Sequence, residues 1–307
     1  MTPVRLVALL VLGASPALAA QARPAPAAPP ATDIFVASLR SAAGPDGVRH
    51  WDVGTPLNVT QRPGYDNQPA FLPDGSGIWY TAIGADGQAD IYRYDFATSA
   101  SVRITATRES EYSPTPIPGG RDFSVVRVEL DSTQRLWAFA PDGTHPRLLL
   151  PGIKPVGYHA WLDSTTLALF VLGTPATLQL ADLRTGASDT VARDIGRSPQ
   201  RVPGRAAASV IWRQDSLHRV IAIVAAGDRV PRPVAPAPDG VDFHAWTPDG
   251  TLLAARGTQI LRWDPRGAAW VPLADFAARG LHDITRLAVS PAGDRLAFVA
   301  IPDAPPR

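Results

Sequence analysis

A turn signal that recurs at a nearly constant distance is the feature that most constrains this chain. Pro73-Asp74-Gly75 has later counterparts that begin at Pro118, Leu162, Pro203, Pro248 and Pro291, so successive copies start 45, 44, 41, 45 and 43 residues apart. Proline presets φ, aspartate can bond its own backbone two residues on, and glycine accepts a positive φ. A repeat of this length is typical of an array of small, similar structural units.

The first copy, residues 68–95, indicates what one unit contains. Residues 68–72 form a short run before the first turn, and residues 78–83 after it are rich in strand-forming side chains. Asp86-Gly87 is a hairpin signal, and residues 90–95 alternate in polarity as a half-buried strand does. Residues 102–105 supply a fourth strand. Four strands in about 45 residues match one blade of a β-propeller.

Two further columns of residues repeat with the turn. Three positions before each turn, and at the equivalent place in the degenerate third copy, the side chain is mostly small, as the crowded axis of a propeller requires. These residues are Ala70, Thr115, Ala160, Gln200, Ala245 and Ala288. A second, apolar column on the third strand contains Ile91, Leu136, Leu178, Val220 and Ile260. Two columns with one period favour true repeats over an irregular β-sandwich, which has no reason to repeat at this distance.

The two ends of the repeat region predict how the ring closes. Residues 33–39 resemble the third strand of a blade and residues 56–60 the fourth, whereas residues 286–290 and 295–301 resemble strands one and two. Joining these halves removes open sheet edges. The sequence therefore predicts an all-β fold over residues 32–307. This is a six-bladed β-propeller of four-stranded antiparallel blades, and its last blade is closed by the N-terminal strands.

The residues before the repeats read as export elements. Residues 1–22 combine Arg5, a short apolar run and a small-residue cleavage site at Ala17-Leu18-Ala19, which is typical of a cleaved signal peptide. The apolar run is too short to span a bilayer, which takes about 20 residues. An uncleaved anchor is the alternative. Residues 23–31 form a proline- and alanine-rich spacer. We expect a periplasmic or secreted protein.

Composition excludes several classes of function. The chain has no cysteine, which rules out a lipid anchor on cysteine, disulfides and thiolate chemistry. Its net charge of +1 offers no basic surface for nucleic acid. Glycine and proline number 25 and 32, which suits a turn-dense all-β fold. We expect a monomer with no membrane insertion and no cofactor.

The residues of the first copy resemble a known family. The pattern P-x-F-x-P-D-G at residues 69–75, followed by D-I-Y-x-x-D at residues 90–95, is similar to the propeller repeat of TolB-like proteins. Residues 245–264 keep the first half well, whereas the third and fourth copies depart from it. The resemblance covers about 270 residues and implies a six-bladed propeller. TolB itself carries a further domain before its propeller, so its partner contacts are not carried over.

The residues that enter the first strand of each repeat are expected at one mouth of the axial channel. Where the repeat places proline, the third and fifth copies place histidine. The candidate binding residues are Gln68, Ser113, Tyr158, His159, Phe243, His244 and Arg286. Loops on a rigid scaffold converge at such a mouth, which favours binding there. The alternative is that His159 and His244 are structural residues that pack beside Tyr158 and Phe243.

Signals for chemistry are weak in this sequence. The two histidines lie two repeats apart without further ligands, so we expect no metal site. No G-x-S-x-G motif or D-x-D-x-D-G calcium loop occurs, and we assign no catalytic residue. We expect a non-catalytic propeller of the cell envelope that docks a protein, peptide or glycan at the channel mouth. A propeller hydrolase or lactonase is the alternative, and a degenerate module without independent function is a third.

Overall fold

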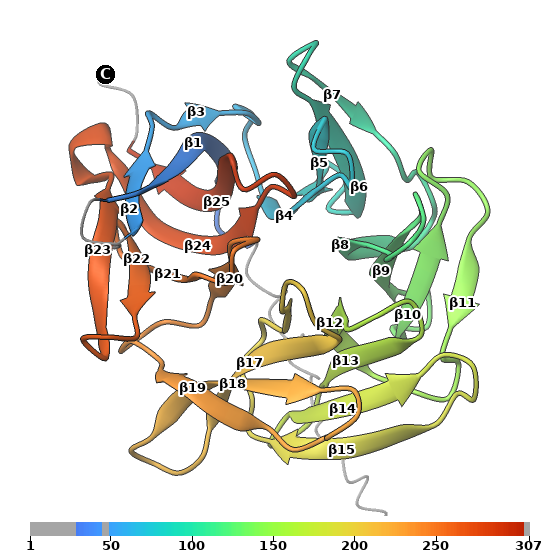
Figure 1. The fold of residues 1–307 in the computed structure, drawn as a ribbon. Helices are drawn as coiled ribbons and strands as arrows, with labels where there is room; N and C mark the ends of the chain where they lie inside the picture. Colours follow the sequence, from blue (N-terminus) through green and yellow to red (C-terminus); the bar gives the residue numbers. More distant parts are fainter. Residues whose placement is uncertain (1–28, 45–48, 304–307) are drawn as a thin grey trace, which may run out of the picture.

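The computed structural model describes residues 29–44 and 49–303. Their strands form six antiparallel sheets, arranged as blades around a central axis (Figure 1). The predicted six-bladed, all-β fold is confirmed. The predicted signal peptide and most of the spacer lie outside the described residues. No helix among the described residues is long and apolar enough to cross a membrane.

Blades one to three follow the chain, each with its innermost strand first. Blade one consists of β4 (Asp66–Phe71), β5 (Gly77–Ile83), β6 (Ala89–Asp95) and β7 (Ala100–Arg103). Blade two consists of β8 (Ser110–Pro116), β9 (Phe123–Val128), β10 (Gln134–Phe139) and β11 (Arg147–Leu149). Blade three consists of β12 (Val156–Trp161), β13 (Thr166–Val171), β14 (Thr177–Asp182) and β15 (Ser188–Arg193).

Blades four and five repeat this order, and blade six combines both ends of the described chain. Blade four consists of β16 (Gln200–Arg201), β17 (Ala207–Arg213), β18 (Arg219–Ala225) and β19 (Arg232–Pro236). Blade five consists of β20 (His244–Trp246), β21 (Leu252–Arg256), β22 (Gln259–Asp264) and β23 (Ala269–Asp275). The short helix η1 (Ala277–Arg279) leads to blade six, which contains β24 (Leu281–Val289), β25 (Arg295–Pro302), β1 (Asp33–Ala43), β2 (Arg49–Val53) and β3 (Leu57–Asn58).

Blade six closes the ring as the sequence predicts, with one addition. β1 pairs with β25 from Asp33 opposite Ala300 to Ser38 opposite Arg295. The outer position is filled in two pieces, because β2 pairs with the second half of β1 and β3 with Phe35 and Val36. Residues 54–56 form a break between these two pieces. The predicted fourth strand, residues 56–60, is therefore shorter than expected and is preceded by β2.

Apolar side chains fill the gaps between neighbouring blades. Each of the six gaps holds one hydrophobic cluster in the described part of the chain. In the gap between blades one and two, for example, the rings of Trp79 and Phe123 lie 4.9 Å apart. Because no gap is left without a cluster, the core is a closed ring of interfaces around the channel.

One residue of the predicted apolar column is wrong by a single position. In blades three and five the column residue is buried and is followed by a bulge against the outer strand, at Leu178 and Ile260. In blade four this bulge follows Ile221, which is buried, whereas Val220 is only half-buried. Ile221 lies 18 residues after Pro203, the distance that also separates Pro73 from Ile91. The prediction placed the column one position too early in blade four because it followed the shorter spacing between turn and column found in blade three.

The N-terminal strand is expected to carry a large share of the stability. Phe35 of β1 stacks on Phe298 of β25 at 5.8 Å, and Phe298 also stacks on Phe276 at 5.2 Å. Because this cluster is fully packed, F35A should lower the free energy of unfolding by about 3–5 kcal/mol. V102A, at an exposed site on β7, should change it by less than about 0.5 kcal/mol.

Urea unfolding of both variants measures the difference. A loss of less than about 1 kcal/mol for F35A would show that the N-terminal strand does not hold the ring closed.

Candidate functional site

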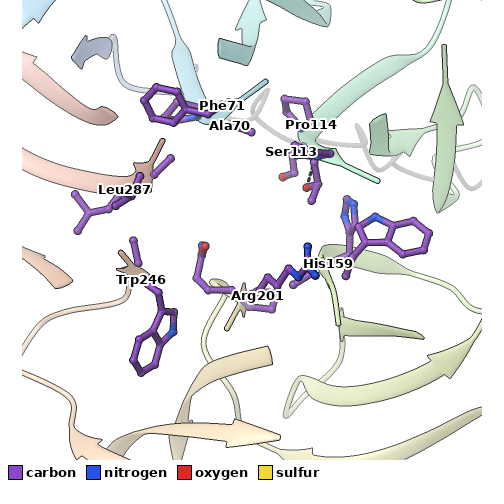
Figure 2. Close-up of a pocket in the computed structure, with 18 of the residues that line it drawn as sticks. Ala70, Phe71, Ser113, Pro114, His159, Arg201, Trp246 and Leu287 are labelled. Atoms are coloured by element: carbon purple, nitrogen blue, oxygen red, sulfur yellow. Dashed lines mark hydrogen bonds between the residues drawn. The ribbon is translucent and has the colours of Figure 1, made fainter. Parts of the chain in front are cut away.

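The innermost strands of all six blades line one axial channel of about 630 Å³ (Figure 2). The lining includes all seven candidate residues from the sequence: Gln68, Ser113, Tyr158, His159, Phe243, His244 and Arg286. Residues of the predicted small column, such as Ala70 and Ala288, line it further along the strands. The structure therefore brings the candidate residues together around one cavity. Their side chains differ, however, in how far they are exposed to solvent.

Three of the candidate residues are placed by the same backbone irregularity. Gln68, Ser113 and Arg286 have φ values of 57°, 56° and 53°, in the left-handed region that side chains other than glycine rarely adopt. In each case two residues of the innermost strand stand opposite one residue of its neighbour, which is a β-bulge. Bulges of this kind are common beside functional sites because they redirect side chains.

Gln68 and Ser113 form a polar bridge between blades one and two. The Gln68 Oε1 atom accepts hydrogen bonds from the Thr81 hydroxyl at 2.8 Å and from the Ser113 backbone N–H at 2.8 Å. These two bonds fix the amide oxygen, and the Gln68 NH₂ group donates to no described residue. The Ser113 hydroxyl is buried and has no hydrogen-bond partner among the described residues. Such groups are rare in folded proteins and indicate a place where a ligand can bond.

The two histidines belong to a repeated module that ties neighbouring blades together. His159 Nε2 lies 2.6 Å from Ser124 Oγ of blade two, and the Trp161 indole N–H donates to the same oxygen at 2.9 Å. His244 Nε2 lies 2.7 Å from Ser209 Oγ of blade four, to which Trp246 donates at 2.8 Å. The sequence His-Ala-Trp at residues 159–161 and 244–246 is thus matched by a serine 35 residues earlier.

Burial keeps both histidines neutral. Only 5% of His159 and 0% of His244 is exposed, and desolvation lowers the pKa of each imidazole to about 3. The expectation that these side chains form part of an open docking surface therefore needs correction, because both belong to the channel lining but are almost wholly buried within it. His159 Nδ1 is nevertheless buried without a partner among the described residues.

Arg286 spans the channel from one blade to the opposite one. Its guanidinium group lies over the Phe243 ring at 4.3 Å and the Tyr158 ring at 4.7 Å, and Nη2 donates to the Tyr158 hydroxyl at 2.9 Å. Tyr158 belongs to blade three and Arg286 to blade six. Stacking on aromatic rings and a phenol, with no carboxylate, leaves the charge of Arg286 largely uncompensated.

The same mouth is surrounded by further phenol groups. Burial raises the pKa of Tyr65 to about 12, against an opposing influence of the positive charge of Arg286. Burial likewise raises the pKa of Tyr112. Both phenols are therefore neutral hydrogen-bonding groups at physiological pH. This end of the channel combines aromatic rings and phenol hydroxyls with the guanidinium group of Arg286.

Blade four contributes two arginines to the lining that sequence reasoning did not select. Arg197 and Arg201 are exposed, line the channel, and form no ion pair with any described carboxylate. Figure 2 shows Arg201 extending from β16 toward the blade that carries His159. Gln200 occupies the position that is alanine in four of the other blades. The sequence did contain a signal for these residues, because Gln200 is large where the small column otherwise has alanine or threonine, and Arg201 follows it directly.

The described residues offer no arrangement typical of a metal centre. No group of three or more His, Cys, Asp or Glu side chains among residues 29–44 and 49–303 is placed to hold an ion. The described lining of the channel also contains three arginines and no aspartate or glutamate. The channel is therefore rich in hydrogen-bond donors and poor in strong acceptors.

Known structures share this fold at low sequence identity. The chain superposes on a candidate TolB from Agrobacterium tumefaciens with a TM-score of 0.68 and 14% identity, over 88% of this chain and 99% of the other. TolB from Acinetobacter baumannii gives a TM-score of 0.56 at 14% identity and covers 88% of this chain. This chain spans 64% of the length of that TolB structure.

Enzymes with propeller domains are similar to the chain as well. An oligogalacturonate lyase in complex with manganese has a TM-score of 0.54 at 12% identity, over 86% of both chains. A puromycin-hydrolysing peptidase from Mycobacterium tuberculosis has a TM-score of 0.54 at 15% identity, over 83% of this chain and 47% of its own. No family model matches the sequence. The structural similarities to the TolB structures show that the chain has the fold of TolB-like propellers, as the repeat predicted.

Replacing both histidines by glutamine is expected to reduce the acid sensitivity of the fold. The folded pKa of about 3 lies below the ordinary 6.5, so the unfolded chain binds more protons between these pH values. Each histidine thus contributes stability that is present above pH 6.5 and is lost as the pH falls toward 3. From pH 7 to 4.5, the wild type should lose at least about 2 kcal/mol more unfolding free energy than H159Q/H244Q.

Urea unfolding of both proteins at the two pH values provides the comparison. The Asp66 carboxyl group, whose pKa burial raises to about 6, has the opposite dependence but is common to both proteins. Equal losses in the two proteins would contradict neutral, buried histidines in the folded state.

Proposed function

We propose that this protein is an exported binding module of the cell envelope and that its propeller channel docks a protein, peptide or glycan. The observation that carries this proposal is the channel itself, a cavity of about 630 Å³ whose lining includes two buried polar groups, from Ser113 of blade two and His159 of blade three, that have no hydrogen-bond partner among the described residues. Buried donors without partners, such as the Ser113 hydroxyl, are expected where a ligand completes the hydrogen bonding.

The backbone of the channel wall supports the same conclusion. Bulges with non-glycine residues in the left-handed region recur in blades one, two and six at the same place in the innermost strand. Strained conformations of this kind are retained where a binding surface requires them. The similarity to TolB structures supports the fold alone. The proposed docking role rests on the residues of this chain.

An enzyme of the propeller hydrolase or lactonase class is the second candidate. Its support is that a lyase and a peptidase share the propeller architecture. The proposal of binding is favoured because general acid–base chemistry needs groups that can exchange protons near neutral pH. The described lining has no carboxylate, and burial keeps its two histidines neutral.

Filling the channel is expected to abolish docking without unfolding the protein. Ala70 lines the channel, so A70W places an indole in the cavity, whereas A97W makes the same change in an exposed turn of blade one. A partner captured from an envelope extract by the wild type is purified, and its affinity for all three proteins is measured. A70W should bind at least tenfold more weakly, and A97W should bind as the wild type does.

Two outcomes would count against the proposal. Equal binding by A70W would move the docking site away from the channel. Turnover of an ester, lactone or glycoside by the wild type, lost in A70W and kept in A97W, would establish the enzyme alternative in its place.

A further inference from the structure

We infer that the channel binds a ligand that has a carboxylate group and a largely apolar body. We further infer that Arg201 of blade four binds this carboxylate. This inference rests on the proposed docking role and names the chemical class of the ligand. The argument begins with charge. The described lining contains Arg197, Arg201 and Arg286 but no aspartate or glutamate.

Arg201 is the arginine most available to a ligand. Arg286 already stacks on two aromatic rings and donates to the Tyr158 hydroxyl. Arg201 is exposed within the channel, and its side chain has neither an ion pair nor a hydrogen bond to any described residue. Its planar fork of N–H donors matches the two oxygens of a carboxylate. Arg197, one residue before the strand-one position of Ser198, adds a second unpaired positive charge at the same blade.

Comparison of the blades explains why Arg201 is free. Trp161 and Trp246 occupy the corresponding position in blades three and five, and each donates to a serine hydroxyl of the preceding blade. By the strand registers, the residue of blade three that corresponds to those serines is Ala168. Ala168 has no hydroxyl to offer. The structural role of this position is therefore absent in blade four, and a cation stands in its place.

Further donors surround the same cavity. The NH₂ group of Gln68 is directed by the two hydrogen bonds that its carbonyl oxygen accepts. The Ser113 hydroxyl and His159 Nδ1 are buried polar atoms of the wall that have no hydrogen-bond partner in the described part of the chain. The Ser124 hydroxyl lies 2.6 Å from His159 Nε2 but 3.3 Å from the Thr115 carbonyl oxygen. The shorter contact favours donation to Nε2, which places the imidazole proton on the buried Nδ1 atom.

The remaining lining selects the body of the ligand. Most of it consists of proline, alanine and aromatic or aliphatic side chains, among them Phe71, Pro114, Trp246 and Leu287 (Figure 2). A carbohydrate acid would bring many hydroxyl donors, for which this lining has few strong acceptors. A carboxylate on an apolar body, such as a hydrophobic peptide terminus or a small aryl or alkyl acid, fits both the donors and the apolar wall.

A matched pair of probes tests this inference directly. N-acetyl-phenylalanine and its amide differ in charge but hardly in shape. Each is titrated into the mature protein while NMR follows the indole N–H signals, two of which come from Trp161 and Trp246 in the lining. The wild type should bind the acid at least tenfold more tightly than the amide. In R201Q this preference should fall below threefold. R40Q, which removes an exposed arginine of β1, should keep it.

The outcomes separate this inference from the docking role. Equal binding of acid and amide, with both lost in A70W, would overturn carboxylate recognition and leave docking in the channel intact. An acid preference that persists in R201Q would remove Arg201 from the site. Glucuronate binding more tightly than N-acetyl-phenylalanine would refute the apolar body, and the absence of saturable binding of the acid would refute the inference as a whole.

Discussion

The pairing of β1 with β25 is the interaction on which the rest of the structure depends. Strands more than 250 residues apart in sequence share six register positions, and the paired phenylalanines 35 and 298 stack within that ladder. Without this pairing, the last blade would expose the edge of β25, and the two clusters that flank blade six would lose the apolar side chains that β1 contributes to each of them. Closure also fixes the width of the channel, because each innermost strand is held from both sides.

A closed ring allows its inner wall to carry strain. The bulges at Gln68, Ser113 and Arg286 each hold a non-glycine residue at positive φ, and they persist because hydrophobic clusters on both sides of the blade fix the flanking strands. The histidine–serine–tryptophan modules act in the same sense at blades three and five. They use a buried polar contact, in place of apolar packing alone, to align one blade with the next.

The sequence predicts the fold well because turn chemistry and strand alternation are local properties. Pro73-Asp74-Gly75 forms the expected turn between β4 and β5, and the halves of blade six were recognisable as separate strands. The channel residues were also predictable as a ring, since strand position alone determines which residues meet at the axis. The bulges, by contrast, depend on the register between neighbouring strands, and no local sequence pattern at Gln68 or Arg286 predicts them.

Exposure was the property that the sequence did not provide. His159 and His244 were expected at an open mouth, and their burial follows from contacts with serines of the preceding blade, 35 residues away. Arg201 was not selected from the sequence as a candidate residue. Its lack of a partner depends on Ala168 in a different blade, and such a relation between distant positions becomes visible only when the strands are placed side by side.

Blade four gives the strongest argument against a decayed module. Its turn sequence has diverged most, yet its core is intact, since Ile211, Ile221 and Ala235 are buried in the cluster shared with blade five. Besides the turn, the departures lie on the channel side of β16, where an amide and a cation replace small or aromatic residues. Loss of function would scatter substitutions through core and channel alike. An intact core beside an altered channel wall is expected when the wall is adapted to a particular ligand.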